Sequence, residues 1–193
     1  MLSLDDYIRE AEIAHGHLCA GQILGVRLAM LGLAKLGIDD PRGKDRKRLV
    51  TFVEIDRCAT DAIGVVTGCR LGKRALKFRD WGKMAATFVD LETGKAIRVA
   101  AKESSKKLAR EMHPEIENKN QQQMLAYREM KDDDLFATQW VKVALPAEEF
   151  PGYKGERIVC AECGEGINFR REVEREGRVL CRACVGERYY DAL

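Results

Sequence analysis

Near its start the chain has two stretches in which apolar residues recur with a helical period. Ser3, followed three residues later by Asp6, resembles a capping box and predicts a short amphipathic helix through about Ala14. After a glycine-containing turn, residues 23–36 are apolar nearly all round. This pattern predicts a helix that is buried on most sides and ends at Gly37.

The middle of the chain alternates between short β-branched stretches and longer, more polar ones. Strands are expected at residues 49–55, 76–78, 87–91, 96–99 and 139–143, and helices at 56–68, 101–112 and 119–131. The strands do not alternate regularly with helices along the chain. The pattern therefore predicts an α+β fold with a mixed helix and sheet core, rather than a doubly wound sheet.

The composition changes after the last expected strand. Proline and glycine accumulate there, as is typical of a linker, and the chain beyond is rich in cysteine and charge. We predict a core domain at residues 1–145, a linker at 146–155 and a small zinc-ribbon-like finger at 156–193.

Composition and charge narrow the function classes. Of the 193 residues 46% are hydrophobic, which is enough for a packed core, and the net charge of +2 drives the chain toward neither nucleic acid nor membranes. Basic clusters at residues 42–48 and 70–79 could bind phosphate or an RNA backbone, although such runs are more often solvated loops. The chain starts with acidic residues, and Arg27 and Lys35 interrupt its most apolar stretch. We therefore expect neither a signal peptide nor a membrane span.

The cysteine count points to metal chemistry. There are seven cysteines, an odd number, and without a secretory signal we expect them in a reducing cytoplasm rather than in disulfides. Two CxxC pairs, Cys160 with Cys163 and Cys181 with Cys184, are separated by seventeen residues. Each pair supplies two sulfurs, and together they complete the tetrahedron that Zn²⁺ prefers. With four protein ligands this zinc site would be structural, and iron is the competing metal.

The partner of the finger is less strongly indicated. Residues 156–193 contain seven arginines and eight acidic residues, a balance that favours a protein partner or a purely structural role over nucleic acid. The segment Cys163-Gly164-Glu165-Gly166-Ile167 with the arginines that follow resembles the four-cysteine finger of the DksA/TraR family.

Three residues of the N-terminal part could form a second site. His17 and Cys19 share a turn bracketed by glycines, and Cys58 follows a predicted strand near a helix N-terminus, which we expect to lower its thiol pKa. His, Cys and Cys make three ligands with an open fourth position for zinc, iron, nickel or copper. The plainer interpretation is that such cysteines pack as small apolar residues, and we favour it for Cys69.

Four motifs, in order, resemble the FmdE family of formylmethanofuran dehydrogenase proteins. They are His15 to Gly21 with Gly25, Asp56 to Ala62, Thr67 to Lys73, and Asp80 to Lys83. The resemblance covers most of residues 1–145. It implies an α+β core that forms an intertwined homodimer, sometimes with an additional C-terminal zinc finger.

The resemblance also implies a cleft where the HGHxC turn meets the cysteine after the strand. It makes His17, Cys19 and Cys58 a metal or reactive-thiol site that would hold zinc, iron or nickel. The implied neighbours in the cleft are His15, Asp61, Cys69 and Lys83, and the candidate catalytic residues are Cys19, Cys58, Asp61 and Lys83.

Three functions fit these patterns. The first is an accessory or redox protein of the FmdE type with a His/Cys cleft. The second is a regulator that senses metal or redox state and binds protein or nucleic acid through the finger. The third is a small metal-dependent enzyme, which the sequence disfavours because it shows no conventional acid–base pair beside the thiols.

Overall fold

The computed structural model describes residues 1–191. The chain divides into two compact units, Met1–Val143 and Ala144–Leu193. Within the described residues, no helix has the length and apolar character needed to cross a membrane.

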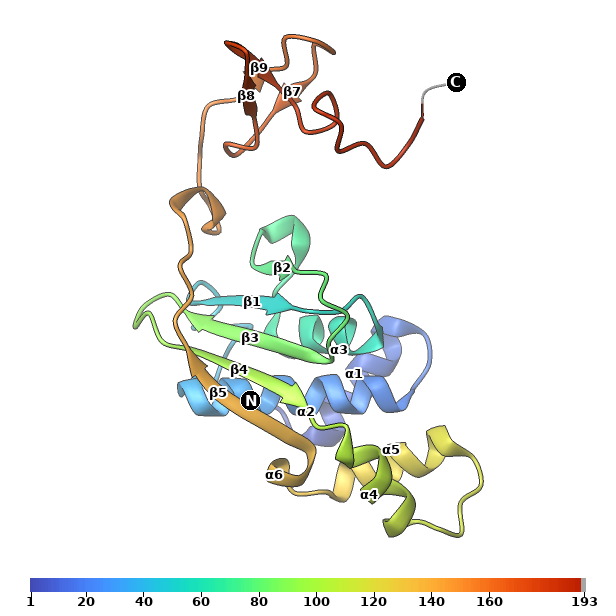
Figure 1. The fold of residues 1–193 in the computed structure, drawn as a ribbon. Helices are drawn as coiled ribbons and strands as arrows, with labels where there is room; N and C mark the ends of the chain where they lie inside the picture. Colours follow the sequence, from blue (N-terminus) through green and yellow to red (C-terminus); the bar gives the residue numbers. More distant parts are fainter. Residues whose placement is uncertain (192–193) are drawn as a thin grey trace. The chain divides into compact units, whose positions relative to one another are not determined.

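The first unit is built on one five-stranded sheet (Figure 1). Its strands are β1 (Leu49–Val53), β2 (Leu76–Phe78), β3 (Ala85–Asp90), β4 (Ala96–Ala101) and β5 (Phe136–Val141). They lie in the order β2-β1-β3-β4-β5. The β1–β2 pair is parallel and the other three pairs are antiparallel. β2 and β5 are therefore the edge strands.

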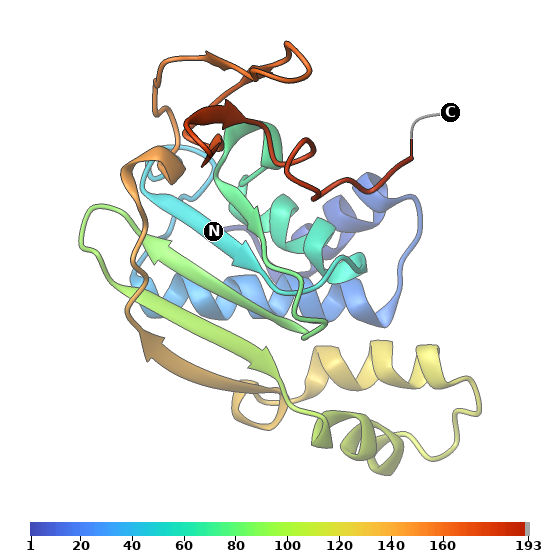
Figure 2. The same ribbon diagram turned by 45° about the horizontal axis from the view of Figure 1, so that its top comes forward.

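Helices pack against this sheet and extend from one end of it (Figures 1 and 2). The first three are α1 (Leu4–His15), α2 (Ala20–Leu36) and α3 (Cys58–Thr67), and a 3-10 turn, η1 (Leu71–Lys73), precedes β2. The connection from β4 to β5 contains α4 (Ser104–Met112), α5 (Lys119–Glu129) and α6 (Asp132–Leu135). Fully buried side chains of α2, such as Ile23 and Leu33, share one core with Phe88 of β3 and Ile97 of β4.

The long helix α2 approaches its neighbours unusually closely at two glycines. A Cβ atom at Gly25 would lie 2.5 Å from the carbonyl oxygen of Ala59 in α3. At Gly32 it would lie 2.2 Å from the ring of Phe88. Because no larger residue fits either contact, these glycines set how near α3 and the sheet lie to α2.

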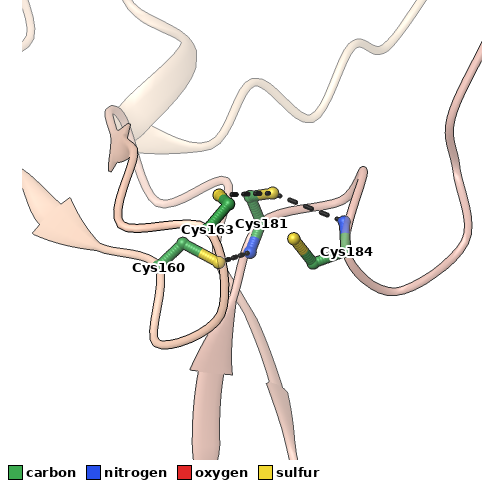
Figure 3. Close-up of side chains that lie close together, drawn as sticks. All are labelled: Cys160, Cys163, Cys181 and Cys184. Carbon is green, nitrogen blue, oxygen red and sulfur yellow. Dashed lines mark hydrogen bonds between the residues drawn. The ribbon is translucent and has the colours of Figure 1, made fainter. Parts of the chain in front are cut away.

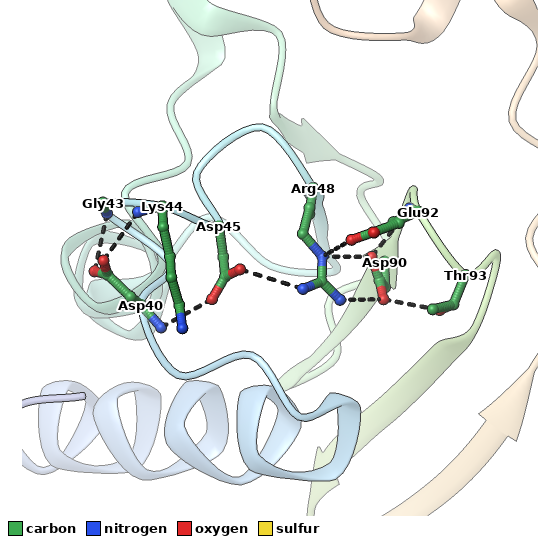
Figure 4. A network of polar contacts seen from close by, with 8 residues as sticks. All are labelled: Asp40, Gly43, Lys44, Asp45, Arg48, Asp90, Glu92 and Thr93. Atoms are coloured by element: carbon green, nitrogen blue, oxygen red, sulfur yellow. Dashed lines mark hydrogen bonds and ion pairs between the residues drawn. The ribbon is translucent and has the colours of Figure 1, made fainter.

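The loop between α2 and β1 is fixed by ion pairs (Figure 4). Arg48 donates to Asp45 at 3.2 Å, to Asp90 at 2.8 Å and to Glu92 at 2.7 Å. Burial alone would raise the pKa of Asp90, but hydrogen bonds from Arg48 and Thr93 hold it below its ordinary value. Arg48 thus ties the loop before β1 to the turn between β3 and β4.

The second unit is small. After the 3-10 turn η2 (Ala147–Glu149) it contains two antiparallel hairpins. The first pairs β6 (Ile158–Val159) with β7 (Gly166–Ile167), and the second pairs β8 (Val173–Arg175) with β9 (Arg178–Leu180). Its buried hydrophobic cluster consists of Cys160, Ile167 and Leu180. So small a core indicates that another source of stability is needed.

The α+β prediction is confirmed, and the differences lie at the boundaries of elements. Ser3 caps α1 as expected, because its hydroxyl accepts from the backbone N–H of Asp6 at 3.2 Å. The last strand begins three residues earlier than predicted, at Phe136. Phe136 pairs with Ala101 of β4. This backbone partner, distant in the sequence, lets the strand begin before the segment 139–143 from which it was predicted.

Candidate functional site

The four C-terminal cysteines form one cluster (Figure 3). The Sγ atoms of Cys160, Cys163, Cys181 and Cys184 all lie within 4.8 Å of one another, and those of Cys163 and Cys181 are 3.9 Å apart. A tetrahedral zinc ion with Zn–S bonds of about 2.3 Å would require sulfur–sulfur separations of about 3.8 Å. The cluster therefore fits a metal ion held by four thiolates.

Backbone geometry places the sulfurs. Cys160 follows β6, and the N–H of Gly164 donates to its carbonyl oxygen at 3.0 Å, which closes the first CxxC turn. Gly164 has φ +74°, a left-handed conformation that glycine adopts without strain. Cys181 follows β9, and its N–H donates to the Sγ of Cys160 at 3.2 Å. The second CxxC turn is thereby attached to the first.

The electrostatics of the cluster also suit a cation. Backbone N–H groups of Cys163 and Glu162 lower the pKa of Cys160 to about 6. Burial and hydrogen bonding to the other three thiols raise the pKa of Cys184 to about 12. Four thiols this close do not ionise together, because each new thiolate repels the next, and a divalent metal removes that repulsion. Arg188, whose Nη2 lies 4.0 Å from Cys184 Sγ, adds further positive charge.

In the first unit the structure brings Cys19 and Cys58 together. Cys19 is the residue before α2, and Cys58 is the first residue of α3. Both face the small space above Gly21, where a Cβ atom would lie 3.6 Å from Cys19 Sγ and 3.5 Å from Cys58 Cβ. These are ordinary van der Waals distances, so both cysteine side chains lie directly beside Gly21. They come from turns far apart in the sequence.

A pocket of about 370 Å³ opens beside Cys58. It is lined by His15, Asp56, Arg57, Cys58, Thr60 and Asp61. His15 Nδ1 lies 2.8 Å from the Asp61 carboxylate, and its ring centroid is 4.7 Å from that of His17. The carboxylate orients the His15 ring, as a carboxylate commonly does for an imidazole that binds a metal or transfers a proton.

The three residues predicted to share a core metal do not form a compact cluster as the four finger cysteines do. Among residues 1–191, the finger cysteines are the one group of at least three His, Cys, Asp or Glu side chains whose ligand atoms all lie within 4.8 Å of one another. His17, Cys19 and Cys58 do not form such a group, and His17 is exposed. A core metal site therefore stays a prediction.

The expected lowering of the Cys58 pKa is wrong. Burial raises the pKa of its thiol, and the hydrogen bond and charge of neighbouring Cys19 raise it further. The helix N-terminus was expected to favour the thiolate. Desolvation and a second thiol outweigh that effect in the folded chain.

The other predicted neighbours of the cleft lie in two different places. Cys69 is buried in the core, where it receives a hydrogen bond from Thr51 and burial raises its thiol pKa. This agrees with the packing interpretation. Lys83 is exposed on the loop after β2, with Nζ 5.7 Å from the ring centroid of Trp81, and does not line the pocket beside Cys58.

Sequence reasoning missed two features of the cleft. Thr60 and Arg57 lie close to Cys58 in the sequence and line the pocket. Their position at the start of a helix beside a cysteine could have identified them as pocket residues. Asn120 of α5 accepts a hydrogen bond at 3.1 Å from the N–H of Ala20, next to Cys19. No sequence signal links residues a hundred positions apart.

A comparison with models of protein families shows which family this chain belongs to. The model of the family described as "FmdE, Molybdenum formylmethanofuran dehydrogenase operon" matches residues 14–137, which is well over half of the chain. The chain belongs to the FmdE family. The matched range includes the HGHxC turn, Cys58, strands β1 to β4 and the first two residues of β5.

A solved structure and a curated protein are also similar. The chain aligns with the crystal structure of a tungsten formylmethanofuran dehydrogenase FmdE-like protein from Syntrophus aciditrophicus, with a TM-score of 0.66 and 22% identity over 98% of this chain and 95% of that one. At this identity the match establishes the fold. A protein of Archaeoglobus fulgidus named "Probable S-adenosyl-L-methionine-binding protein" is 30% identical over 91% of this chain. This FmdE chain spans about half (51%) of that relative's length.

Proposed function

We propose that this FmdE protein is an accessory redox protein whose reactive centre is the thiol pair Cys19 and Cys58. The observation that carries the proposal is the meeting of these two thiols above Gly21, at the starts of two helices and beside a pocket. Two adjacent thiols can bind a soft transition metal or exchange electrons as a dithiol. His17 is near enough in sequence to complete a metal site after a movement of its turn.

In this proposal the four-cysteine finger holds zinc as a structural ion. All four positions of the tetrahedron are occupied by protein sulfurs, which leaves none for a substrate. The finger thus stabilises the second unit, and the chemistry belongs to the first.

A small thiol- or metal-dependent enzyme is the second candidate, and one observation favours it. The sequence showed no acid–base pair beside the thiols, whereas the structure pairs His15 with Asp61 at 2.8 Å in the wall of the pocket that contains Cys58. An imidazole oriented by a carboxylate is a common proton acceptor. The remaining function, a regulator acting through the finger, has no comparable observation in its favour.

The metal content of protein purified without oxygen tests the proposal. We expect Cys163→Ser to lose about one zinc per chain, because one of its four ligands is removed. Cys19→Ser and Cys58→Ser should keep that zinc and lose a second metal. The matched control is Cys69→Ala, which removes a cysteine from the core but not from the cleft and should keep both metals.

The rate at which iodoacetamide alkylates the cysteines distinguishes a thiol centre without metal from cysteines that only pack. If Cys19→Ser changes no metal content but speeds up iodoacetamide labelling of Cys58, because Cys19 no longer raises the pKa of that thiol, the cleft is a thiol centre without a resident metal. If neither metal content nor labelling distinguishes Cys19 and Cys58 from Cys69, these cysteines are packing residues and the proposal is wrong.

A further inference from the structure

Positive charge is concentrated in one segment of the FmdE core. Residues 70–83 contain six basic residues and a single acid, Asp80, so this segment carries +5 in a chain whose net charge is +2. The rest of the chain is consequently acidic overall. Lys77 is buried and Arg74 is half-buried, so the exposed charged residues of this segment are four basic residues and Asp80, a surface charge of +3.

The fold lays this segment along an open edge of the sheet. Arg70 and Lys73 are exposed in and before η1, and Arg79 and Lys83 are exposed just beyond the other end of β2. β2 is the terminal strand of the sheet. We call these four residues together with Trp81 the β2-edge patch. Its basic residues come before and after β2 rather than at one point of the chain, an arrangement that suits an extended anion better than a single phosphate.

The patch also presents an aromatic ring. The side chain of Trp81 is 61% exposed, although burying an indole would normally be favourable. The Lys83 ammonium lies 5.7 Å from the centroid of this ring. An exposed ring beside cations is the usual platform for stacking an unpaired base, because every base has a π-face and a phosphate close to it.

The patch is attached to the segment that leads to the thiol cleft. The backbone N–H groups of Trp81 and Lys83 both donate to the carbonyl oxygen of Glu54, at 3.2 and 3.1 Å. Glu54 lies only four residues before Cys58, and Arg57, which lines the pocket, adds a further exposed cation between them. The pocket itself is also lined by Asp56 and Asp61, so the phosphate contacts are assigned to the β2-edge patch and not to the pocket.

We propose that the β2-edge patch binds single-stranded nucleic acid, with phosphates on Arg70, Lys73, Arg79 and Lys83 and one base stacked on Trp81. A duplex fits less well, because its bases are already stacked and do not reach the ring. An acidic protein segment would use the cations but would leave Trp81 without a role. The proposal does not depend on a metal or on thiol chemistry in the cleft.

Fluorescence anisotropy with a labelled oligouridine tests the inference on the full-length chain. Four phosphate contacts predict a slope of log K against log salt of about −3 for a single strand. Arg70→Ala/Lys73→Ala should bring the slope to about half of that value. The matched control is Arg46→Ala/Lys47→Ala, which removes two exposed charges from another loop and should leave binding nearly unchanged.

Trp81 supplies the second readout. Trp81→Ala should weaken binding about tenfold with an unchanged salt slope, because stacking rather than charge is lost. In a Trp140→Phe background, oligouridine should quench the remaining indole fluorescence. The inference is overturned if the two double variants weaken binding equally, if Trp81→Ala has no effect, or if a duplex of the same length binds as tightly.

Discussion

At the scale of single residues, the cleft depends on a glycine as well as on its thiols. Gly25 of α2 allows Ala59 of α3, the residue after Cys58, to touch the backbone of α2. A Cβ atom at Gly21, one turn earlier, would make only ordinary van der Waals contacts with Cys19 and Cys58. The close approach of α3 to α2, and with it the position of Cys58, is thus set by Gly25, which carries no chemistry itself.

Gly25→Ala should strongly destabilise the protein. The new Cβ would lie 2.5 Å from the carbonyl oxygen of Ala59 and 2.7 Å from its Cα, and backbone atoms cannot move aside as a flexible side chain would. We expect a loss of about 1–3 kcal/mol in the free energy of unfolding, measured by urea denaturation. Gly72→Ala is the control, because its Cβ would meet nothing within 4 Å, and it should change stability little. Equal effects of the two substitutions would contradict this account of the helix contact.

At the scale of elements, Arg48 connects two segments at the same end of the sheet. It joins the loop after α2 to the β3–β4 turn through Asp45, Asp90 and Glu92. Asp90 is 1% exposed in this network. A buried carboxylate of this kind contributes only while it is ionised and paired.

This ion pair predicts a pH dependence of stability. The folded pKa of Asp90 lies below its unfolded value of about 3.9, so its contribution is complete above that pH and is lost as the pH falls through the folded pKa. Asp90→Asn should cost about 1–2 kcal/mol at neutral pH, and that difference should shrink below about pH 4. Urea denaturation from pH 7 to 3 measures it.

The control for Asp90 is Glu117→Gln, which removes an exposed carboxylate and should leave the pH profile of the wild type unchanged. A difference between Asp90→Asn and wild type that stays constant down to pH 3 would show that the ionisation of Asp90 does not contribute.

At the scale of the whole molecule, the two units are stabilised in different ways. The larger core of the first unit contains residues from its helices and sheet, whereas the core of the second consists of three residues, one of them a metal-ligand candidate. Binding of structural zinc contributes about 10–16 kcal/mol in small zinc-binding peptides. With zinc bound at the four cysteines, as proposed, the folding of the second unit would depend mainly on that metal.

Removing that metal should therefore unfold one unit and spare the other. After treatment with a strong chelator under reducing conditions, limited proteolysis should cut within residues 144–191, while residues 1–143 stay intact on the same timescale. Re-addition of Zn²⁺ should restore protection, because the ligands are chemically unchanged. If the finger resists protease without metal, its hairpins fold on their own and the structural role of zinc is wrong.

Local features of the sequence were enough to predict much of this architecture. The cap at Ser3, the apolar run of α2 and the spacing of the CxxC pairs act over a few residues, and each has its expected result in the fold. The motifs from His15 to Lys83 likewise indicated the FmdE family that the family comparison shows. In these cases the physical cause lies within one turn, one helix or one pair of CxxC turns.

Only the tertiary structure decided the cleft and the early start of β5. The pairing of His15 with Asp61 and the contact of Cys19 with Cys58 depend on how α1, α2 and α3 pack, and β5 extends to Phe136 because β4 offers it a partner. The raised pKa of Cys58 follows from the same packing, since burial and Cys19 act on it together. Sequence spacing describes neighbours along the chain, whereas burial and charge act between residues brought together in space.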